Sequence, residues 1–341
     1  MSERSFDTII VGAGPAGLSC AAELARAGRE VLVLERMTRV GPKPCAGGIP
    51  AGVLPSGIPR ELVERSFKRQ HLLTPGRNLQ IEDPQPLIHT VDRAGLGRWM
   101  LEQAREAGAE IVTGARVVKV AGRSLQTNDQ AFNWHHLVGA DGSNSVVRRH
   151  LGLPVKLAGI GINYQLPRPL PELEWHFNPQ LFGSGYAWIF PHRHSSSAGV
   201  YGFRRLQRSS LLHQRFLVWA HKRGLNLEGI QPRASLVSFD YRGSRFGDIF
   251  LTGDAAGLAS GLTGEGIAAA IISGQAAARA ILAGDGRAPQ LGELTKRHAL
   301  HRRLACLLAG QRGFGVSLAL KALTWALEHR ILSPKALELG H

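Results

Sequence analysis

Residues 7–17, DTIIVGAGPAG, decide the fold class of this chain. A short apolar strand (7–11) runs into the glycine turn GAGPAG (12–17), and the helical composition that follows predicts a helix ending at Gly28. A second apolar strand, VLVLE, ends at Glu35, 18 positions after the third glycine. Strand, glycine turn, helix and acidic residue together form the dinucleotide-binding fingerprint of a Rossmann-like domain.

Each position of the fingerprint has a physical role. Gly12 permits a tight turn, Gly14 lets the backbone approach a pyrophosphate, and Gly17 lets helix and strand pack closely. The helix N-terminus directs its partial positive charge at the phosphates. Glu35 can accept hydrogen bonds from the adenosine ribose. The fingerprint by itself fits both FAD and NAD.

Two later segments favour FAD. Residues 137–149, LVGADGSNSVVRR, predict a strand that leads into a basic helix start. Residues 249–267, IFLTGDAAGLASGLTGEGI, predict a strand, a turn at Asp254 and a glycine-rich entry into a helix that runs to about Leu282. This second segment resembles the element by which flavoprotein hydroxylases hold FAD. There, Asp254 would accept from a ribityl hydroxyl, and the helix N-terminus would stabilise negative charge on the reduced flavin.

With these segments in view, the chain resembles the geranylgeranyl reductase family, a branch of the hydroxylase-like flavoproteins, over about residues 5–285. The similarity includes GAGPAG and also VDRAGLGRWM (91–100), ADGSNSVVRR and GDAAGLASGLTGEGI. Its most specific motifs are the Cys-x-Gly-Gly loop in PCAGG (44–48) and the Tyr-x-Trp-x-Phe-Pro strand YAWIFP (186–191).

The resemblance implies an α/β (α+β) fold of three parts. They are a discontinuous Rossmann-like FAD-binding domain (1–65, 90–150 and 240–290), a p-hydroxybenzoate-hydroxylase-like antiparallel-sheet substrate domain (66–89 and 151–239), and a short helical C-terminus (291–341). Besides Gly12, Gly14 and Gly17, the resemblance implies flavin contacts at Ala16, Glu35, Cys45, Ala46, Gly48, Arg93, Val117, Asp254, Gly266 and Ile267. No metal site is expected. One departure is Gly261, where the family usually has proline, and it predicts a more mobile loop beside the flavin.

The strand YAWIFP suggests the substrate side. Its alternation places Tyr186, Trp188 and Phe190 on one face, which is either sheet core or the wall of an apolar pocket. In this family's fold the second sheet roofs the flavin, so the pocket is favoured, with residues 198–203 as a neighbouring strand. An aromatic wall suits an isoprenoid chain.

The resemblance implies reduction of carbon–carbon double bonds in a prenyl lipid, with hydride from flavin N5 and a proton from the site. The candidate catalytic residues are Cys45, Tyr186 and Trp188. Cys45 is either the acid or a small spacer that permits close flavin approach. The alternatives are a monooxygenase or halogenase acting on an apolar substrate, and a flavoprotein electron carrier. YAWIFP lacks the paired tryptophans of halogenases, and the Cys-x-Gly-Gly loop is unexpected in a monooxygenase.

Composition and charge bear on partners. The chain of 341 residues holds 41 Lys and Arg against 26 Asp and Glu, a net charge of +15. This basic surface is either simply solvated or suits an anionic membrane, a phosphorylated substrate, or an acidic donor such as ferredoxin or flavodoxin; NADPH is the alternative donor. The sequence carries no nucleic-acid reader motif, so no nucleic-acid partner is expected.

The predicted location is cytoplasmic. The N-terminus lacks a signal-peptide layout, the sequence has no apolar run of 18 residues, and its three cysteines fit neither a metal site nor a paired disulfide set. Basic residues cluster at 296–303, and the later segment GFGVSLALKALTWAL is apolar. These helices either pack over the pocket or lie on a membrane, which would make the protein peripheral to the inner face of the membrane.

Overall fold

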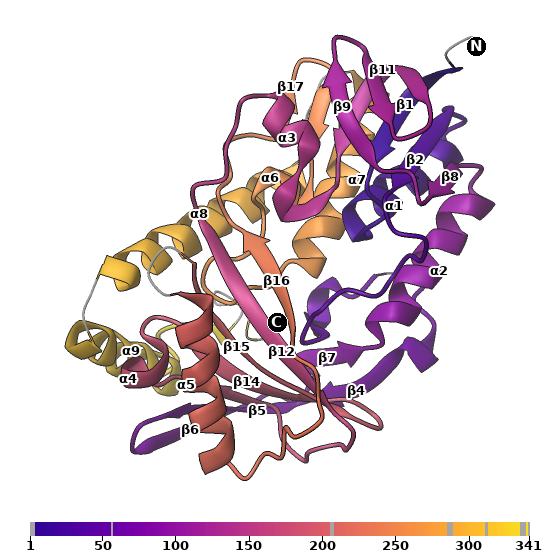
Figure 1. The fold of residues 1–341 in the computed structure, drawn as a ribbon. Helices are drawn as coiled ribbons and strands as arrows, with labels where there is room; N and C mark the ends of the chain where they lie inside the picture. The colour runs from indigo at the N-terminus through magenta and orange to yellow at the C-terminus, as the bar shows by residue number, and fades with distance from the viewer. Residues whose placement is uncertain are drawn as a thin grey trace.

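The computed structural model describes residues 4–55, 57–204, 208–284, 289–310, 313–334 and 339. Two large sheets organise the chain, and Figure 1 shows them one above the other, with the C-terminal helices beside the lower one. The upper sheet holds the N-terminus, and the lower sheet holds the aromatic strand.

The upper sheet is the Rossmann-like one. Its parallel strands run in the order β18-β11-β1-β2-β8. Their bounds are β1 (Arg4–Val11), β2 (Val31–Glu35), β8 (Glu110–Thr113), β11 (Ala131–Gly139) and β18 (Ile249–Leu251). Three antiparallel strands extend it, namely β17 (Arg245–Phe246), β9 (Val117–Ala121) and β10 (Ser124–Thr127). The second half of β1 and nearly all of β2 are buried and apolar, as central parallel strands covered by helices require.

Three helices form a common core with this sheet: α1 (Pro15–Arg26), α2 (Arg93–Glu106) and α7 (Ile267–Ala283). Helices α1 and α7 pack so closely that a Cβ on Gly274 would lie 2.1 Å from the carbonyl oxygen of Ala16. The segment after β18 thereby lies against the glycine turn after β1. Shorter helices follow β11 and β18, namely α3 (Val146–His150) and α6 (Gly253–Ala256).

The lower sheet has the order β16-β12-β15-β14-β13-β5-β6. Its strands are β5 (Arg69–Thr74), β6 (Arg77–Glu82), β12 (Ala158–Leu166), β13 (Glu174–His176), β14 (Tyr186–Pro191), β15 (Ser196–Phe203) and β16 (Arg233–Ser238). Every pair is antiparallel except β13 with β5, which is parallel. The predicted neighbouring strand at 198–203 is confirmed, because β15 pairs with all of β14, from Tyr186 opposite Tyr201 to Pro191 opposite Ser196. Helix α5 (Ser209–Lys222) packs on one face of this sheet, and α4 (Pro179–Phe182) contacts α5.

A third, small sheet was not anticipated from the sequence. It joins β3 (Gly48–Pro50), β7 (Ile88–Val91) and β4 (Val63–Phe67) in the order β3-β7-β4. Because β3 begins at the last glycine of the Cys-x-Gly-Gly loop, this sheet fixes one end of that loop.

The C-terminal helices are α8 (Pro289–Gly310) and α9 (Gly313–Glu328). In α8, His298 Nδ1 lies 2.8 Å from the Leu258 carbonyl oxygen, which ties this helix to the segment after α6. Leu323 and Leu327 of α9 join the cluster that contains the aromatic strand. Within the described ranges, none of the helices combines the length and the apolar character needed to cross a bilayer.

The predicted fold class is confirmed: an α/β Rossmann-like unit is joined to a second, largely antiparallel sheet and a short helical C-terminus. The predicted helix stop at Gly28 is also confirmed, since α1 ends at Arg26 and Gly28 adopts a positive φ of 77°. The domain boundaries stay a prediction.

Candidate functional site

One cavity of about 860 Å³ collects the predicted site residues from both large sheets and the loops between them. Those in its lining are Gly12, Gly14, Ala16, Glu35, Cys45, Ala46, Gly48, Arg93, Val117, Tyr186, Trp188, Asp254, Gly266 and Ile267. Gly17 lies behind this lining, where its predicted role is in packing.

The glycine turn combines close backbone packing at Gly12 and Gly17 with open space at Gly14. Gly12 has φ +104°, and a Cβ there would lie 2.5 Å from the Ala140 carbonyl oxygen. A Cβ on Gly17 would lie 2.0 Å from the carbonyl oxygen of Gly12. At Gly14, by contrast, a Cβ would meet none of the described atoms within 4 Å. Gly14 therefore faces open space at the start of α1, where the helix N-terminus suits a phosphate.

Glu35 is fixed at the edge of the cavity by the backbone. Its Oε2 accepts a hydrogen bond from the Ala13 N–H at 2.8 Å, and its Oε1 accepts from the Met37 N–H at 2.9 Å. Each carboxylate oxygen keeps further acceptor capacity. The carboxylate is thus oriented, and it can still bind the hydroxyls of a ribose.

Arg93 is a half-buried cation without a counter-charge in the described parts of the chain. It is the first residue of α2, whose N-cap Asp92 accepts from the Ala94 N–H at 2.9 Å. Its Nε and Nη1 are buried with no hydrogen-bond partner among the described residues. Because an unpaired buried guanidinium is costly, this side chain fits a bound anion such as the phosphates of FAD.

Asp254 lies at the start of α6, and two side chains that the sequence analysis did not identify contact its carboxylate. Lys43 Nζ lies 3.3 Å from Asp254 Oδ2, and the Ser143 hydroxyl donates to the same oxygen at 3.1 Å. Lys43 lies in the segment 41–48 around Cys45, called the Cys45 loop below, so the ion pair joins two walls of the cavity. The carboxylate side chain is 10% exposed and its Oδ1 is not used in these contacts, which leaves an acceptor for a ribityl hydroxyl.

Gly47 and Gly48, which follow Cys45 and Ala46, are in close contact with two rings of this protein. A Cβ on Gly47 would lie 2.6 Å from His192 Cε1, and one on Gly48 would lie 2.4 Å from Phe190 Cε2. Both rings belong to β14 or directly follow it. The glycines are therefore needed because side chains of this protein pack on the loop, which the sequence could not reveal.

The aromatic side of the cavity is built by β14 and its neighbour. Tyr186, Trp188 and Phe190 are all buried and share one cluster, so the predicted common face is confirmed. Sequence reasoning missed Trp175 on β13, whose ring centroid lies 4.9 Å from that of Phe190 and 5.2 Å from that of Tyr186. Its position within the short strand EWH is the only local signal, and strand alternation could have placed it on this face.

Two tyrosine hydroxyls connect this wall to the loop that contains Gly261. Tyr201 donates to the Gly261 carbonyl oxygen at 3.3 Å, and Tyr186 donates to the Thr263 carbonyl oxygen. A Cβ on Gly261 would lie 3.0 Å from the Phe239 ring. These contacts hold the loop in place; its greater mobility relative to a proline-containing loop stays a prediction.

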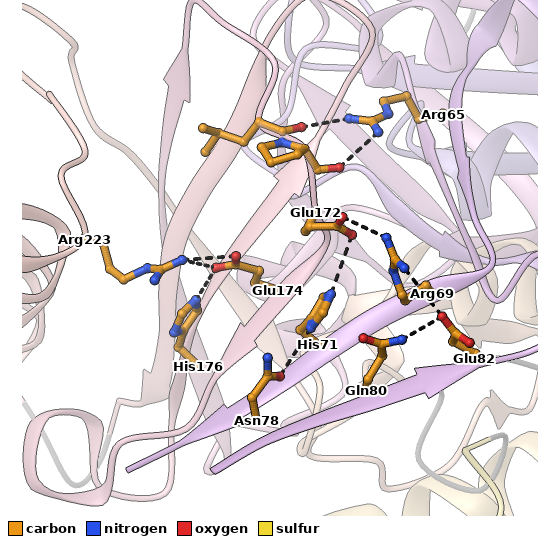
Figure 2. Close-up of polar contacts among 12 residues, drawn as sticks. Arg65, Arg69, His71, Asn78, Gln80, Glu82, Glu172, Glu174, His176 and Arg223 are labelled. Carbon is orange, nitrogen blue, oxygen red and sulfur yellow. Dashed lines mark hydrogen bonds and ion pairs between the residues drawn. The ribbon is translucent and has the colours of Figure 1, made fainter. Parts of the chain in front are cut away.

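The opposite face of β13, β5 and β6 carries charged side chains, and Figure 2 shows this network. Glu174 and His176 flank Trp175 on β13, and alternation directs them away from the cavity. His176 Nε2 lies 2.6 Å from Glu174 Oε2, which also accepts from Arg223 at 2.7 Å. Burial lowers the pKa of His176 from its ordinary value, outweighing the opposite effect of Glu174. At β13 the sheet thus has an ionic side opposite its aromatic side, whereas the opposite side of β14 packs on α5 through an apolar cluster.

The cavity combines a glycine cradle open at Gly14, an oriented acidic residue, an arginine whose buried Nε and Nη1 lack described partners, and an aromatic wall; together these features indicate the class of protein. It is an FAD-dependent oxidoreductase with the hydroxylase-like flavoprotein fold. The model of the FAD binding domain family matches residues 5–161.

Relatives specify the family. The chain is 30% identical to the geranylgeranyl diphosphate reductase of Rhodobacter capsulatus, covering 82% of this chain and 75% of that protein. It is 31% identical to digeranylgeranylglycerophospholipid reductase 1 of Methanopyrus kandleri, covering 80% and 79%. A geranylgeranyl bacteriochlorophyll reductase-like structure from Thermoplasma acidophilum has a TM-score of 0.78 at 20% identity, covering 92% of this chain and 90% of that one. The chain belongs to the geranylgeranyl reductase family of flavoproteins.

Proposed function

We propose that this protein reduces carbon–carbon double bonds in the prenyl chain of a lipid. The observation that carries the proposal is the composition of the cavity of about 860 Å³: a dinucleotide cradle around Gly14 and Arg93 opens onto the aromatic wall of Tyr186 and Trp188. A polar cradle suits the cofactor, and an aromatic wall suits an isoprenoid better than a polar acid.

Reduction of an isolated alkene adds a hydride to one carbon and a proton to the other, so the π bond is replaced by two C–H bonds. Bound FAD, once reduced, supplies the hydride. The residues of the chain would hold FAD through Gly14, Glu35, Arg93 and Asp254 and would align the alkene along the aromatic wall. Because Trp175, Tyr186, Trp188 and Phe190 are each at most 6% exposed, this wall excludes water from the alkene.

Cys45 is the candidate proton donor or spacer in this proposal. It is half-buried in the cavity lining, and its Sγ accepts a hydrogen bond from the Gly47 N–H at 3.4 Å. This contact gives the thiol a fixed direction, which either role requires. Cys45→Ser and Cys45→Ala distinguish the roles: loss of turnover in both with FAD retained supports the acid, whereas activity in the alanine variant supports the spacer.

The names of the two relatives support the substrate class, since one reduces a prenyl diphosphate and the other a prenylated glycerophospholipid. The electron donor, either NADPH or an acidic ferredoxin or flavodoxin, is part of the proposal, and the net charge of +15 favours an acidic protein.

We also propose that α8 and α9 contact the membrane that holds the lipid. Exposed apolar side chains are spaced seven residues apart on each helix, at Leu300 and Leu307 and at Leu318 and Trp325. Exposed basic residues accompany them at Lys296, Arg303 and Lys321. An apolar stripe flanked by cations is the pattern of a surface that lies on anionic lipid, and it would make the protein peripheral to the cytoplasmic face.

The test is anaerobic reduction of the FAD-loaded protein, followed by incubation with geranylgeranyl diphosphate, a geranylgeranylated glycerophospholipid and a prenylated quinone. Mass spectrometry should show a gain of two hydrogen atoms per double bond in at least one of them. A gain of one oxygen atom under air would favour a monooxygenase. Reduced FAD with every lipid unchanged would contradict the proposal and favour an electron carrier.

A further inference from the structure

The end of the aromatic strand contacts the Cys45 loop through a buried histidine. His192 directly follows β14 and is 6% exposed. Its ring packs on Gly47 so closely that a Cβ on that residue would lie 2.6 Å from His192 Cε1. Its two nitrogens then reach in different directions: Nε2 lies 3.0 Å from the Ala46 carbonyl oxygen, and Nδ1 contacts Glu64 Oε2.

The two partners of the ring determine how many protons it holds. A carbonyl oxygen only accepts hydrogen bonds, and so does an ionised carboxylate. A neutral imidazole carries one N–H and cannot donate to both. Both contacts can form at once when the ring is an imidazolium, which a carboxylate in direct contact stabilises.

The carbonyls of three consecutive residues in this loop are each held by a different element. The Asn163 side chain of β12 donates to the Cys45 carbonyl oxygen at 3.5 Å, and the Val91 N–H of β7 donates to the Gly47 carbonyl oxygen at 2.9 Å. Between them, His192 donates to Ala46. Asn163 Oδ1 in turn accepts from Ser197 at 2.6 Å, whose hydroxyl accepts from Trp188 Nε1 at 2.9 Å.

This arrangement connects the aromatic wall to the Cys45 loop. The Asn163 contact is at the limit of hydrogen-bond length, and the Val91 contact is between neutral groups. With both ring nitrogens donating, the His192 contact is charge-assisted, and such bonds are roughly twice as strong as neutral ones. His192 is therefore the member of the set on which the position of the loop depends most.

We propose that His192, held as an imidazolium by Glu64, is a positioning residue that fixes the Cys45 loop against the cavity. The inference rests on the proposed function for its catalytic meaning, because a proton donor or a spacer must be held at one distance from the alkene and the flavin. The interaction itself, a hydrogen bond from the charged His192 ring to the Ala46 carbonyl oxygen (the clamp), does not depend on turnover.

The first test measures the clamp in the FAD-free protein. In a Cys306→Ser background, which removes the exposed thiol while Cys20 stays buried, alkylation of Cys45 by iodoacetamide reports how often the loop opens. His192→Leu removes the donor and should accelerate alkylation about tenfold, the effect of about 1.4 kcal/mol. His192→Gln keeps an N–H for the Ala46 carbonyl and should restore the rate to within about threefold. His194→Gln, at an exposed position two residues on, is the matched control and should have no effect.

The second test observes the protons directly. In protein labelled with ¹⁵N-histidine, two-bond proton–nitrogen spectra should show an imidazolium signal that is absent from His192→Gln, which assigns it to His192, and that becomes a neutral-ring signal in Glu64→Gln. If His192→Leu fails to fold, this spectrum and the glutamine variant still decide. A neutral His192 ring in the parent protein would overturn the proposal, as would unchanged Cys45 alkylation in the folded leucine variant.

A third measurement separates this inference from the proposed function. With a lipid that is turned over, His192→Leu should lower kcat and leave KM within about twofold, because the clamp positions the loop and does not bind the prenyl chain. If no lipid is reduced by the parent protein, the proposed function fails while the alkylation and NMR results still stand. A raised KM with unchanged kcat in His192→Leu would contradict a positioning role.

Discussion

Two glycines of the same turn should respond in opposite ways to the same added methyl group. Gly17 packs α1 against the turn, and a Cβ there would lie 2.0 Å from the Gly12 carbonyl oxygen, a backbone atom that cannot move alone. Gly14 faces the cavity, and a Cβ there would contact none of the described atoms within 4 Å. We therefore expect Gly17→Ala to damage the fold and Gly14→Ala to damage only cofactor binding.

The magnitudes follow from this geometry. Overpacking of a close contact costs about 1–3 kcal/mol, so Gly17→Ala should lower the free energy of unfolding of the FAD-free protein by about 2 kcal/mol or more. Gly14 has φ −79° and ψ 178°, which alanine adopts without strain, so its substitution should change that free energy by less than about 1 kcal/mol. The same methyl group, placed where the pyrophosphate approaches, should weaken FAD binding by about tenfold to a hundredfold.

Urea denaturation of the FAD-free proteins measures the first quantity, and titration of flavin fluorescence measures the second. Gly28→Ala is a useful control, because it lies outside the cavity at a positive φ of 77° and should lower stability without a direct effect on FAD. Unchanged FAD affinity in Gly14→Ala would refute the assignment of this turn as the pyrophosphate site. Undiminished stability in Gly17→Ala would refute the packing argument.

Three further predictions concern single contacts. Arg93→Gln should weaken FAD binding by about tenfold or more and should leave the FAD-free protein no less stable, because the buried Nε and Nη1 of Arg93 lack described partners. FAD titration measures the effect, with Arg105→Gln at an exposed position as the control. Burial lowers the pKa of His176 below its ordinary 6.5, so the unfolded chain takes up a proton at a higher pH than the folded protein does. Stability should therefore fall as the pH drops below about 6.5. Urea midpoints measured against pH should show a flatter profile for His176→Asn than for the parent protein. Trp325→Ser should reduce binding to phosphatidylglycerol vesicles by about fivefold in co-sedimentation. Val218 on α5 is equally exposed, and Val218→Ser should not reduce this binding. An equal loss of vesicle binding in both variants would refute the proposed membrane surface.

Much of the upper sheet could be predicted from the sequence because its signals are local. The glycine turn, the strand before it and Glu35 lie within about thirty residues, and each residue type is dictated by the backbone at its own position. The alternation in YAWIFP likewise predicts its aromatic face without knowledge of the neighbouring strands. The small sheet of β3, β4 and β7 escaped prediction because its strands are short and only one of them has a clear pattern.

The sequence by itself determined the class of cofactor and the family. A dinucleotide cradle needs glycine at fixed spacing, which is readable along the chain; the segments 137–149 and 249–267 then favour FAD, and PCAGG and YAWIFP indicate the family. Only the tertiary structure decided what surrounds Cys45. His192 and Glu64 lie 146 and 18 positions from Ala46, and they meet it because β14 ends beside β4 and the loop. Hydrogen bonds between such distant residues depend on sheet pairing, and no local pattern encodes them. The same is true of Gly47 and Gly48, whose small size is required by rings that the folded chain brings against them.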